Sequence, residues 1–87
     1  MPFESADCPL CKSAAERETL AFDGYYYSCP SCGKFEIGSI AFRKALAGQL
    51  PPNIPGDVRR LQAEGKLPRI EFNAPDFEVV PVDPARR

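Results

Sequence analysis

Residues 25–35, with the sequence YYYSCPSCGKF, place three consecutive tyrosines directly before a Cys-Pro-Ser-Cys-Gly turn. A similar turn, CPLCK, lies at residues 8–12, and the two turns together hold all four cysteines of the chain. The cysteines form two C-x2-C pairs with 17 residues between them, a spacing typical of structural zinc sites. Such pairs can also belong to a disulfide framework or a redox dithiol, so the chemistry of these turns decides the fold.

Both turns have features of metal-binding knuckles. Two residues between paired cysteines allow a tight turn to direct both sulfurs at one ion. In the second turn, Pro30 fixes φ after Cys29 and Gly33 permits a left-handed backbone. The first turn has Pro9 but carries Lys12 where the second has glycine, and Lys12 brings positive charge to the thiolates. The predicted ligands of one metal ion are Cys8, Cys11, Cys29 and Cys32.

The expected cellular compartment argues against the alternatives. The chain opens with MPFESADC, which lacks a basic and apolar leader, and no apolar stretch is long enough to span a bilayer. We therefore expect a cytoplasmic protein, and cytosolic thiols are kept reduced. No βαβ pattern surrounds either pair, which disfavours a thioredoxin-like dithiol. Two unrelated pairs of buried cysteines would not be expected to share the CPxC pattern at this separation.

A site with four sulfur ligands is closed. No position remains for water or substrate, and closed sites are structural rather than catalytic. Tetrahedral thiolate coordination suits zinc and also a single iron of the rubredoxin kind. We expect one Zn²⁺, the usual metal of ribbon-like modules with C-x2-C pairs, and keep iron as the alternative. An iron site would make the protein an electron carrier.

The chain has the size of one small domain that needs a staple, since it holds 87 residues of which 44% are apolar. An extended run over residues 18–22, the Asp23-Gly24 turn and residues 25–28 predict a β-hairpin. Alternating apolar and polar residues predict a third strand at 34–38. The expected fold is a small metal-stapled α+β domain that begins with a zinc ribbon of three antiparallel strands.

The three tyrosines belong to this ribbon, which we assign to residues 1–38. Successive side chains of a strand point to opposite faces, so Tyr25 and Tyr27 share one face and Tyr26 lies on the other. Aromatic side chains often cover the core of a small sheet, and we favour this role over stacking on a ligand.

The sequence after the predicted ribbon changes to a helical period. Ser39 is a candidate N-cap, and Phe42, Leu46 and Leu50 recur at helical spacing. The proline-rich run PPNIPG is expected to end this helix.

A second short helix is predicted over DVRRLQAEGK, with Asp57 as N-cap and with Val58 and Leu61 facing inward. Both helices are too short to be stable alone, so we expect residues 39–72 to form a helical extension packed on the ribbon. Its last segment, LPRIEF, alternates in the manner of a strand. Residues 73–87 contain three prolines and are expected to be an extended or loose tail, or a strand that binds another protein.

Charge divides the chain into three segments. Residues 1–38 carry three basic and six acidic side chains, 39–69 carry six basic and two acidic, and 70–87 carry two basic and four acidic. Four thiolates and a divalent ion would change the charge of the first segment from −3 to −5. Phosphate binding requires basic side chains, so nucleic-acid contacts are expected only from the middle segment. The candidate contacts with nucleic acid or an acidic partner are Arg43, Lys44, Arg59, Arg60, Lys66 and Arg69. We favour the alternative that they are solvated helix faces.

The stretch DGYYYSCPSCGKFEIGSIAF, with CPLC upstream and VRRLQAEGKLPRI downstream, resembles small zinc-ribbon modules with the rubredoxin-like pattern CPxC...CPxCG at the start of uncharacterised bacterial and phage proteins. The resemblance covers residues 6–70. It implies that Cys8, Cys11, Cys29 and Cys32 are zinc ligands. Such modules are usually appended to a larger effector domain, so the resemblance implies metal binding and no particular activity.

The residue types offer little for catalysis. The chain has no histidine, its serines lack an evident general base, and Glu16 and Glu18 lie in a polar linker. We therefore expect a structural zinc-binding protein that is not an enzyme and acts as a protein-interaction adaptor, through its tyrosine face or its apolar tail. The alternatives are a nucleic-acid-binding zinc ribbon and a rubredoxin-like iron electron carrier. The expected partner is another protein, with nucleic acid as the second choice and no membrane association.

Overall fold

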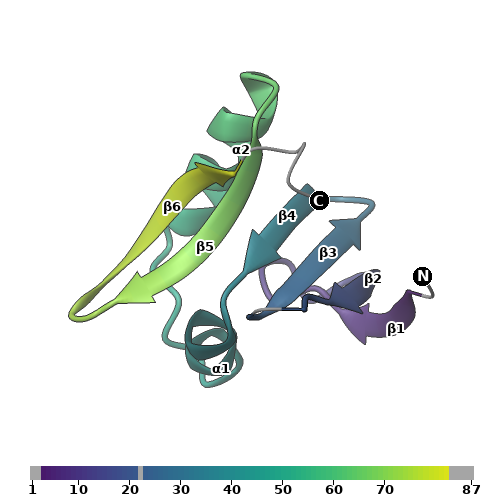
Figure 1. Cartoon of the computed structure of the whole chain (residues 1–87), viewed down its shortest axis with the longest axis horizontal. Helices are drawn as coiled ribbons and strands as arrows, with labels where there is room; N and C mark the ends of the chain where they lie inside the picture. The colour runs from purple at the N-terminus through teal and green to yellow at the C-terminus, as the bar shows by residue number, and fades with distance from the viewer. Residues whose placement is uncertain (1–2, 22, 83–87) are drawn as a thin grey trace.

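The computed structural model describes residues 3–21 and 23–82, and within them one sheet has the strand order β1-β2-β3-β4-β5-β6. Two helices lie between the fourth and fifth strands in the chain (Figure 1). The elements are β1 (Glu4–Asp7), β2 (Ala14–Thr19), β3 (Tyr25–Cys29), β4 (Gly33–Ile37), α1 (Ser39–Leu46), α2 (Ile54–Ala63), β5 (Leu67–Asn73) and β6 (Asp76–Val82). Neighbouring strands are antiparallel except β4 and β5, which run parallel.

The ribbon contains one strand more than the sequence predicted. All of β1 pairs with β2, although its sequence, ESAD, holds no β-branched or aromatic residue that would signal a strand. β2 lies over Ala14–Thr19, earlier than the strand predicted at 18–22, and Phe22 of that prediction lies outside the described residues. The sequence of β2, AAERET, is mostly polar and does not mark a strand. Its pairing with β1 and β3 therefore determines where the strand lies.

The connection between β2 and β3 includes the predicted Asp23-Gly24 pair but is longer than a two-residue turn, because β2 ends at Thr19 and β3 begins at Tyr25. The Leu20 N–H donates to the Gly24 carbonyl at 3.0 Å. Gly24 has a φ of +88°, and a Cβ at this position would lie 2.0 Å from the carbonyl oxygen of Ile37. Only glycine fits this turn, since a side chain would be strained in its backbone conformation and would also collide with β4.

The C-terminal part is a β-hairpin, so the prediction of three strands and an extended tail is wrong. β5 and β6 pair along their whole length, and β5 joins the ribbon through the pairs Glu36↔Arg69 and Ile37↔Ile70. The prolines that suggested a tail do not interrupt the sheet. Pro75 lies between the two strands, and β6 is an edge strand, where a missing N–H is tolerated. Residues 83–87 of the predicted tail lie outside the described residues.

Helix α1 faces the core with a different side from the one predicted. Its N-cap is Gly38 rather than Ser39. Of the predicted stripe, Leu46 is wrong, because it is 63% exposed. Phe42 and Leu50 are partly buried against the core, although the helix ends before Leu50. The buried residues of α1 are Ala41 and Ala45. These small side chains let the helix approach the rest of the domain closely.

Helix α2 begins at Ile54, before the predicted N-cap Asp57. Pro55 lies in its first turn, where the missing N–H is not needed. Val58 and Leu61 are buried, as predicted. Both helices pack against β5. No helix in the described part of the chain is long and apolar enough to span a membrane.

The core joins the ribbon aromatics to the helices. Tyr27 is fully buried and stacks on Phe35 with ring centroids 5.5 Å apart. Tyr25 and Tyr27 both approach Phe42 of α1, at 4.8 and 6.4 Å between centroids, whereas Tyr26 approaches Phe3 at 6.1 Å. The tyrosines therefore alternate between faces as predicted, and Tyr25 and Tyr27 are used for packing.

Candidate metal centre

The four cysteines converge at one end of the ribbon. Cys8 follows β1, Cys11 lies in the connection before β2, Cys29 ends β3, and Cys32 precedes β4. Their four sulfur atoms all lie within 4.8 Å of one another. The Sγ atoms of Cys11 and Cys29 are 3.5 Å apart. The cluster therefore connects the β1–β2 connection to the β3–β4 turn.

A backbone N–H group points at a sulfur in each turn. The Leu10 N–H donates to Cys8 Sγ, and the Cys32 N–H donates to Cys29 Sγ, both at 3.4 Å. Hydrogen bonds to the charged form of a group favour that form. The two turns are thus built to stabilise thiolates.

A residue with a left-handed backbone follows each pair of cysteines. Gly33 has a φ of +85° and Lys12 a φ of +66°. The two turns therefore share a backbone conformation although only the second has glycine there. The Lys12 ammonium donates to the Pro9 carbonyl at 3.4 Å, which keeps its charge within the first knuckle. Around the second knuckle, a Cβ at Gly33 would lie 2.8 Å from Nε2 of Gln62 in α2.

The donor set fits a tetrahedral metal ion. A zinc–thiolate bond of about 2.3 Å places tetrahedral sulfurs about 3.8 Å apart. The 3.5 Å separation of Cys11 and Cys29 and the 4.8 Å limit on all four sulfurs are close to this value. No disulfide joins any two of the four cysteines. Four soft sulfur ligands suit zinc or iron and leave no coordination position open.

Burial and hydrogen bonding shift the pKa values of the cysteine thiols in different directions. Desolvation raises the pKa of Cys8 to about 11 and also raises the pKa of Cys32. Desolvation opposes ionisation of Cys11 too, but hydrogen bonds from Ser13 and neighbouring thiols outweigh it and lower the pKa of Cys11 to about 6. A metal ion must therefore displace protons from the buried sulfurs of Cys8 and Cys32, whereas Cys11 gives up its proton more readily.

The basic residues of the middle segment do not have equal access to a ligand. Arg43 and Arg59 are exposed, and the Lys44 ammonium lies 4.5 Å from the centroid of the Phe72 ring. Two others form exposed ion pairs, Arg60 with Asp57 at 3.2 Å and Lys66 with Glu64 at 3.3 Å. Arg69 also lies beside carboxylates, so half of the six candidate contacts are paired with acidic side chains.

Arg69 lies buried in an ion-pair cluster. It is 7% exposed, and its guanidinium contacts Glu36 at 3.1 Å, Asp23 at 3.3 Å and the carboxylate of Glu71. Asp23 also accepts a hydrogen bond from the Ser39 hydroxyl at 2.7 Å. This bond, a second one from the Ser39 N–H and the nearby Arg69 charge lower the pKa of Asp23. Arg69 thus links the β2–β3 turn to β4 and β5, and its guanidinium does not belong to an exposed basic surface.

Sequence reasoning missed this cluster. The one local signal is Glu36, a carboxylate between the apolar Phe35 and Ile37, and it is only 1% exposed. A buried charge requires a partner. Arg69 lies 33 residues away in the sequence, so no local pattern could pair the two.

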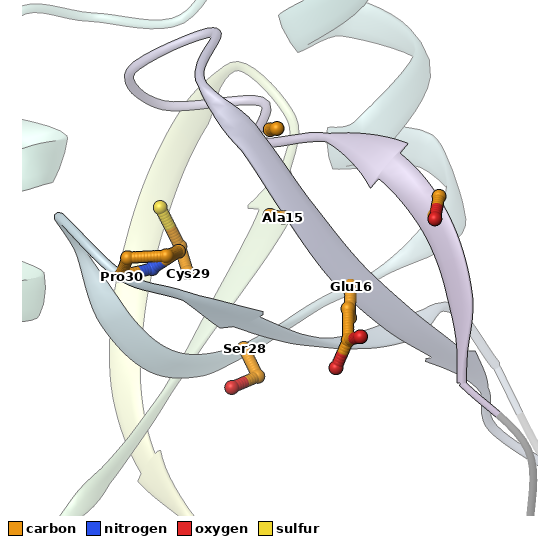
Figure 2. A pocket seen from close by; sticks show the side chains of 7 residues that line it. Ala15, Glu16, Ser28, Cys29 and Pro30 are labelled. Carbon is orange, nitrogen blue, oxygen red and sulfur yellow. The ribbon is translucent and has the colours of Figure 1, made fainter.

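An open hollow of about 440 Å³ lies beside the second knuckle (Figure 2). Its lining residues are Ser5, Ala14, Ala15, Glu16, Ser28, Cys29 and Pro30. Ser5, Glu16 and Ser28 lie opposite one another in the register of β1, β2 and β3. The hollow therefore presents one carboxylate and two hydroxyl groups next to the metal-binding turn.

Comparisons with protein-family models, with curated proteins and with solved structures gave no match. The cysteine cluster is consistent with a zinc-ribbon-like site. The structure brings together the four cysteines that the resemblance names, in a small α+β domain with a six-stranded sheet over the described residues.

Proposed function

We propose that this chain is a structural metal-binding protein in which Cys8, Cys11, Cys29 and Cys32 hold one Zn²⁺. The observation that carries the proposal is the convergence of four sulfurs from two turns within 4.8 Å. Zinc is preferred over iron because it is the usual occupant of paired C-x2-C knuckles. When bound, the ion supplies a crosslink between two turns and no open coordination position, so the proposed role is not catalytic.

The proposed role of the site is to hold the ribbon together. The four-cysteine cluster connects the short, polar β1 and its following turn to the β3–β4 turn. A domain of 87 residues has a small core, and a structural metal is a common way to stabilise it.

We further propose that the domain works as an adaptor that binds another protein. Supporting this are the exposed apolar side chains Phe3, Ile40 and Leu46, which are 43%, 53% and 63% exposed. Ile40 and Leu46 both lie on α1. The nucleic-acid alternative is less well supported, because Arg60, Lys66 and Arg69 already face carboxylates.

Elemental analysis of the protein purified from cells tests the metal proposal. We expect about one zinc per chain and a colourless protein. Cys32→Ser should lose the metal, whereas Ser31→Ala, an exposed neighbour in the same turn, should retain it. A red protein that contains iron would instead support the rubredoxin-like alternative.

Capture of partners on the immobilised, zinc-loaded protein tests the adaptor proposal. We expect a protein partner that survives nuclease treatment and is lost in the double variant Ile40→Asp, Leu46→Asp. Thr19→Asp, an exposed change at the end of β2, serves as the control. Capture that disappears with nuclease, or DNA binding that weakens steeply with salt, would favour the nucleic-acid alternative.

A further inference from the structure

We propose that Cys11 is the oxidation site of the cluster, where a hydroperoxide converts Cys11 and Cys29 into a disulfide and the metal is released. This inference rests on the proposed metal-binding function and adds a regulatory property to it. Two independent features of the cluster carry it, the unequal exposure of the four cysteines and the distance between two of the sulfurs.

Exposure singles out Cys11. Cys8, Cys29 and Cys32 are 0%, 5% and 7% exposed, whereas Cys11 is exposed. All four sulfurs are thiolates when they bind a metal, so their intrinsic reactivity is similar and access by the oxidant decides which one reacts. A small hydroperoxide can therefore reach the Cys11 sulfur while the core shields the other three.

Cys29 is placed to complete the reaction. Its sulfur is 3.5 Å from that of Cys11, and a disulfide requires about 2.05 Å. The two sulfurs belong to different turns, so a disulfide between them requires the first knuckle to move toward β3. Oxidation-sensitive cysteines commonly have such a resolving partner close by.

The chemistry proceeds in two balanced steps. The Cys11 thiolate attacks one oxygen of the hydroperoxide, the O–O bond breaks, and the product alkoxide or hydroxide takes a proton from water. The sulfur is oxidised by two electrons to a sulfenic acid, and the peroxide is reduced. The Cys29 thiolate then attacks the Cys11 sulfur, the S–O bond breaks, and the departing hydroxide takes a proton to form water.

The metal leaves because two of its four ligands no longer carry negative charge. The new disulfide still connects the two turns, while Cys8 and Cys32 lose the metal and each takes a proton from water to become a thiol. Reduction by a thiol followed by added zinc restores the original site, so the site becomes a reversible redox switch.

Peptide mapping of the zinc-loaded protein tests the proposal. The zinc content is first measured by elemental analysis, so that failure to bind zinc is recognised as failure of the proposed function. The loaded protein is then titrated with hydrogen peroxide while a chromophoric indicator records released zinc. We expect the Cys11–Cys29 disulfide to form first, with about one zinc lost for each disulfide.

Limited alkylation of the loaded protein provides a second readout that needs no variant and no folding of a mutant. We expect most of the first label on the peptide that contains Cys11. First disulfides that join Cys8 or Cys32, zinc release without any Cys11 modification, or equal labelling of the four cysteines would each overturn the proposal.

Discussion

Arg69 shows how a single charged side chain contributes to the packing of this domain. Its guanidinium is buried between β4, β5 and the β2–β3 turn, where it faces the carboxylates of Glu36, Asp23 and Glu71. A buried ion pair is weak evidence of net stabilisation, but removal of one partner is strongly destabilising because the other charge stays buried. Substitution of Arg69 therefore measures how much this ion-pair cluster matters for the stability of the fold.

We expect Arg69→Met to lower the free energy of unfolding of the zinc-loaded protein by about 3 kcal/mol, since it removes the guanidinium from beside the buried Glu36. Urea unfolding followed by circular dichroism measures the change. Arg59→Met is the matched control, because Arg59 is exposed and its loss should change stability by no more than about 0.5 kcal/mol. Equal stability of the two variants would contradict the structural role of Arg69.

A second residue-scale prediction concerns Gly24. Gly24→Ala should destabilise the protein by about 2 to 3 kcal/mol, because the backbone is left-handed and a Cβ would lie 2.0 Å from the Ile37 carbonyl. Gly56→Ala, in the first turn of α2, meets no atom within 4 Å and should be neutral or mildly stabilising. Thermal unfolding of both variants distinguishes the two sites, and a neutral Gly24→Ala would contradict the turn geometry.

Among the secondary-structure elements, sequence patterns predicted those that a few neighbouring residues determine. The Asp23-Gly24 turn, the strand at Gly33–Ile37 and the inward residues Val58 and Leu61 follow from turn chemistry and periodicity. The four cysteines of the candidate site were predicted in the same way, from two short turns. β1, a polar strand, and β6, a strand containing proline, were not, because their neighbours in the sheet determine them.

The start of α1 leads to a prediction about pH. Asp23 accepts hydrogen bonds from the Ser39 hydroxyl and N–H, and these bonds, with the Arg69 charge, lower its pKa. A group with a lowered pKa contributes stability above its unfolded-state value, near 3.9 for aspartate, and loses it as the pH falls through the lower folded value. Asp23→Asn should therefore destabilise the protein by the same small amount, below about 1 kcal/mol because the carboxylate is 48% exposed, at pH 8 and at pH 6.

Urea unfolding of the zinc-loaded variant and parent at these two pH values checks the expectation. Asp76→Asn, an exposed change at the start of β6, is the control for loss of an acidic side chain. A penalty for Asp23→Asn that grows between pH 8 and pH 6 would show that another titrating group controls this helix end.

For the whole molecule, the sheet depends on two different kinds of connection. The ribbon strands β1 to β4 share the cysteine cluster, whereas β5 joins them by two backbone pairs and the Arg69 cluster. We expect removal of the metal to unfold at least residues 8–37, because so small a ribbon cannot hold four sulfurs together without the ion. Loss of dispersed amide signals in an NMR spectrum after chelation, restored by added zinc, measures this. Retained native dispersion in the fully metal-free protein would refute a structural role.

The pH dependence of metal binding connects the cluster to the stability of the whole domain. Burial raises the pKa of Cys8 to about 11 and also that of Cys32 in the folded domain, and a thiol of the unfolded, metal-free ribbon, with a pKa of about 8.5, is also protonated at neutral pH. Zinc must release both protons, so its apparent affinity should fall by at least about a hundredfold for each unit decrease in pH. Competition with a chromophoric chelator at pH 8, 7 and 6 measures the slope, and an affinity independent of pH would exclude thiolate coordination.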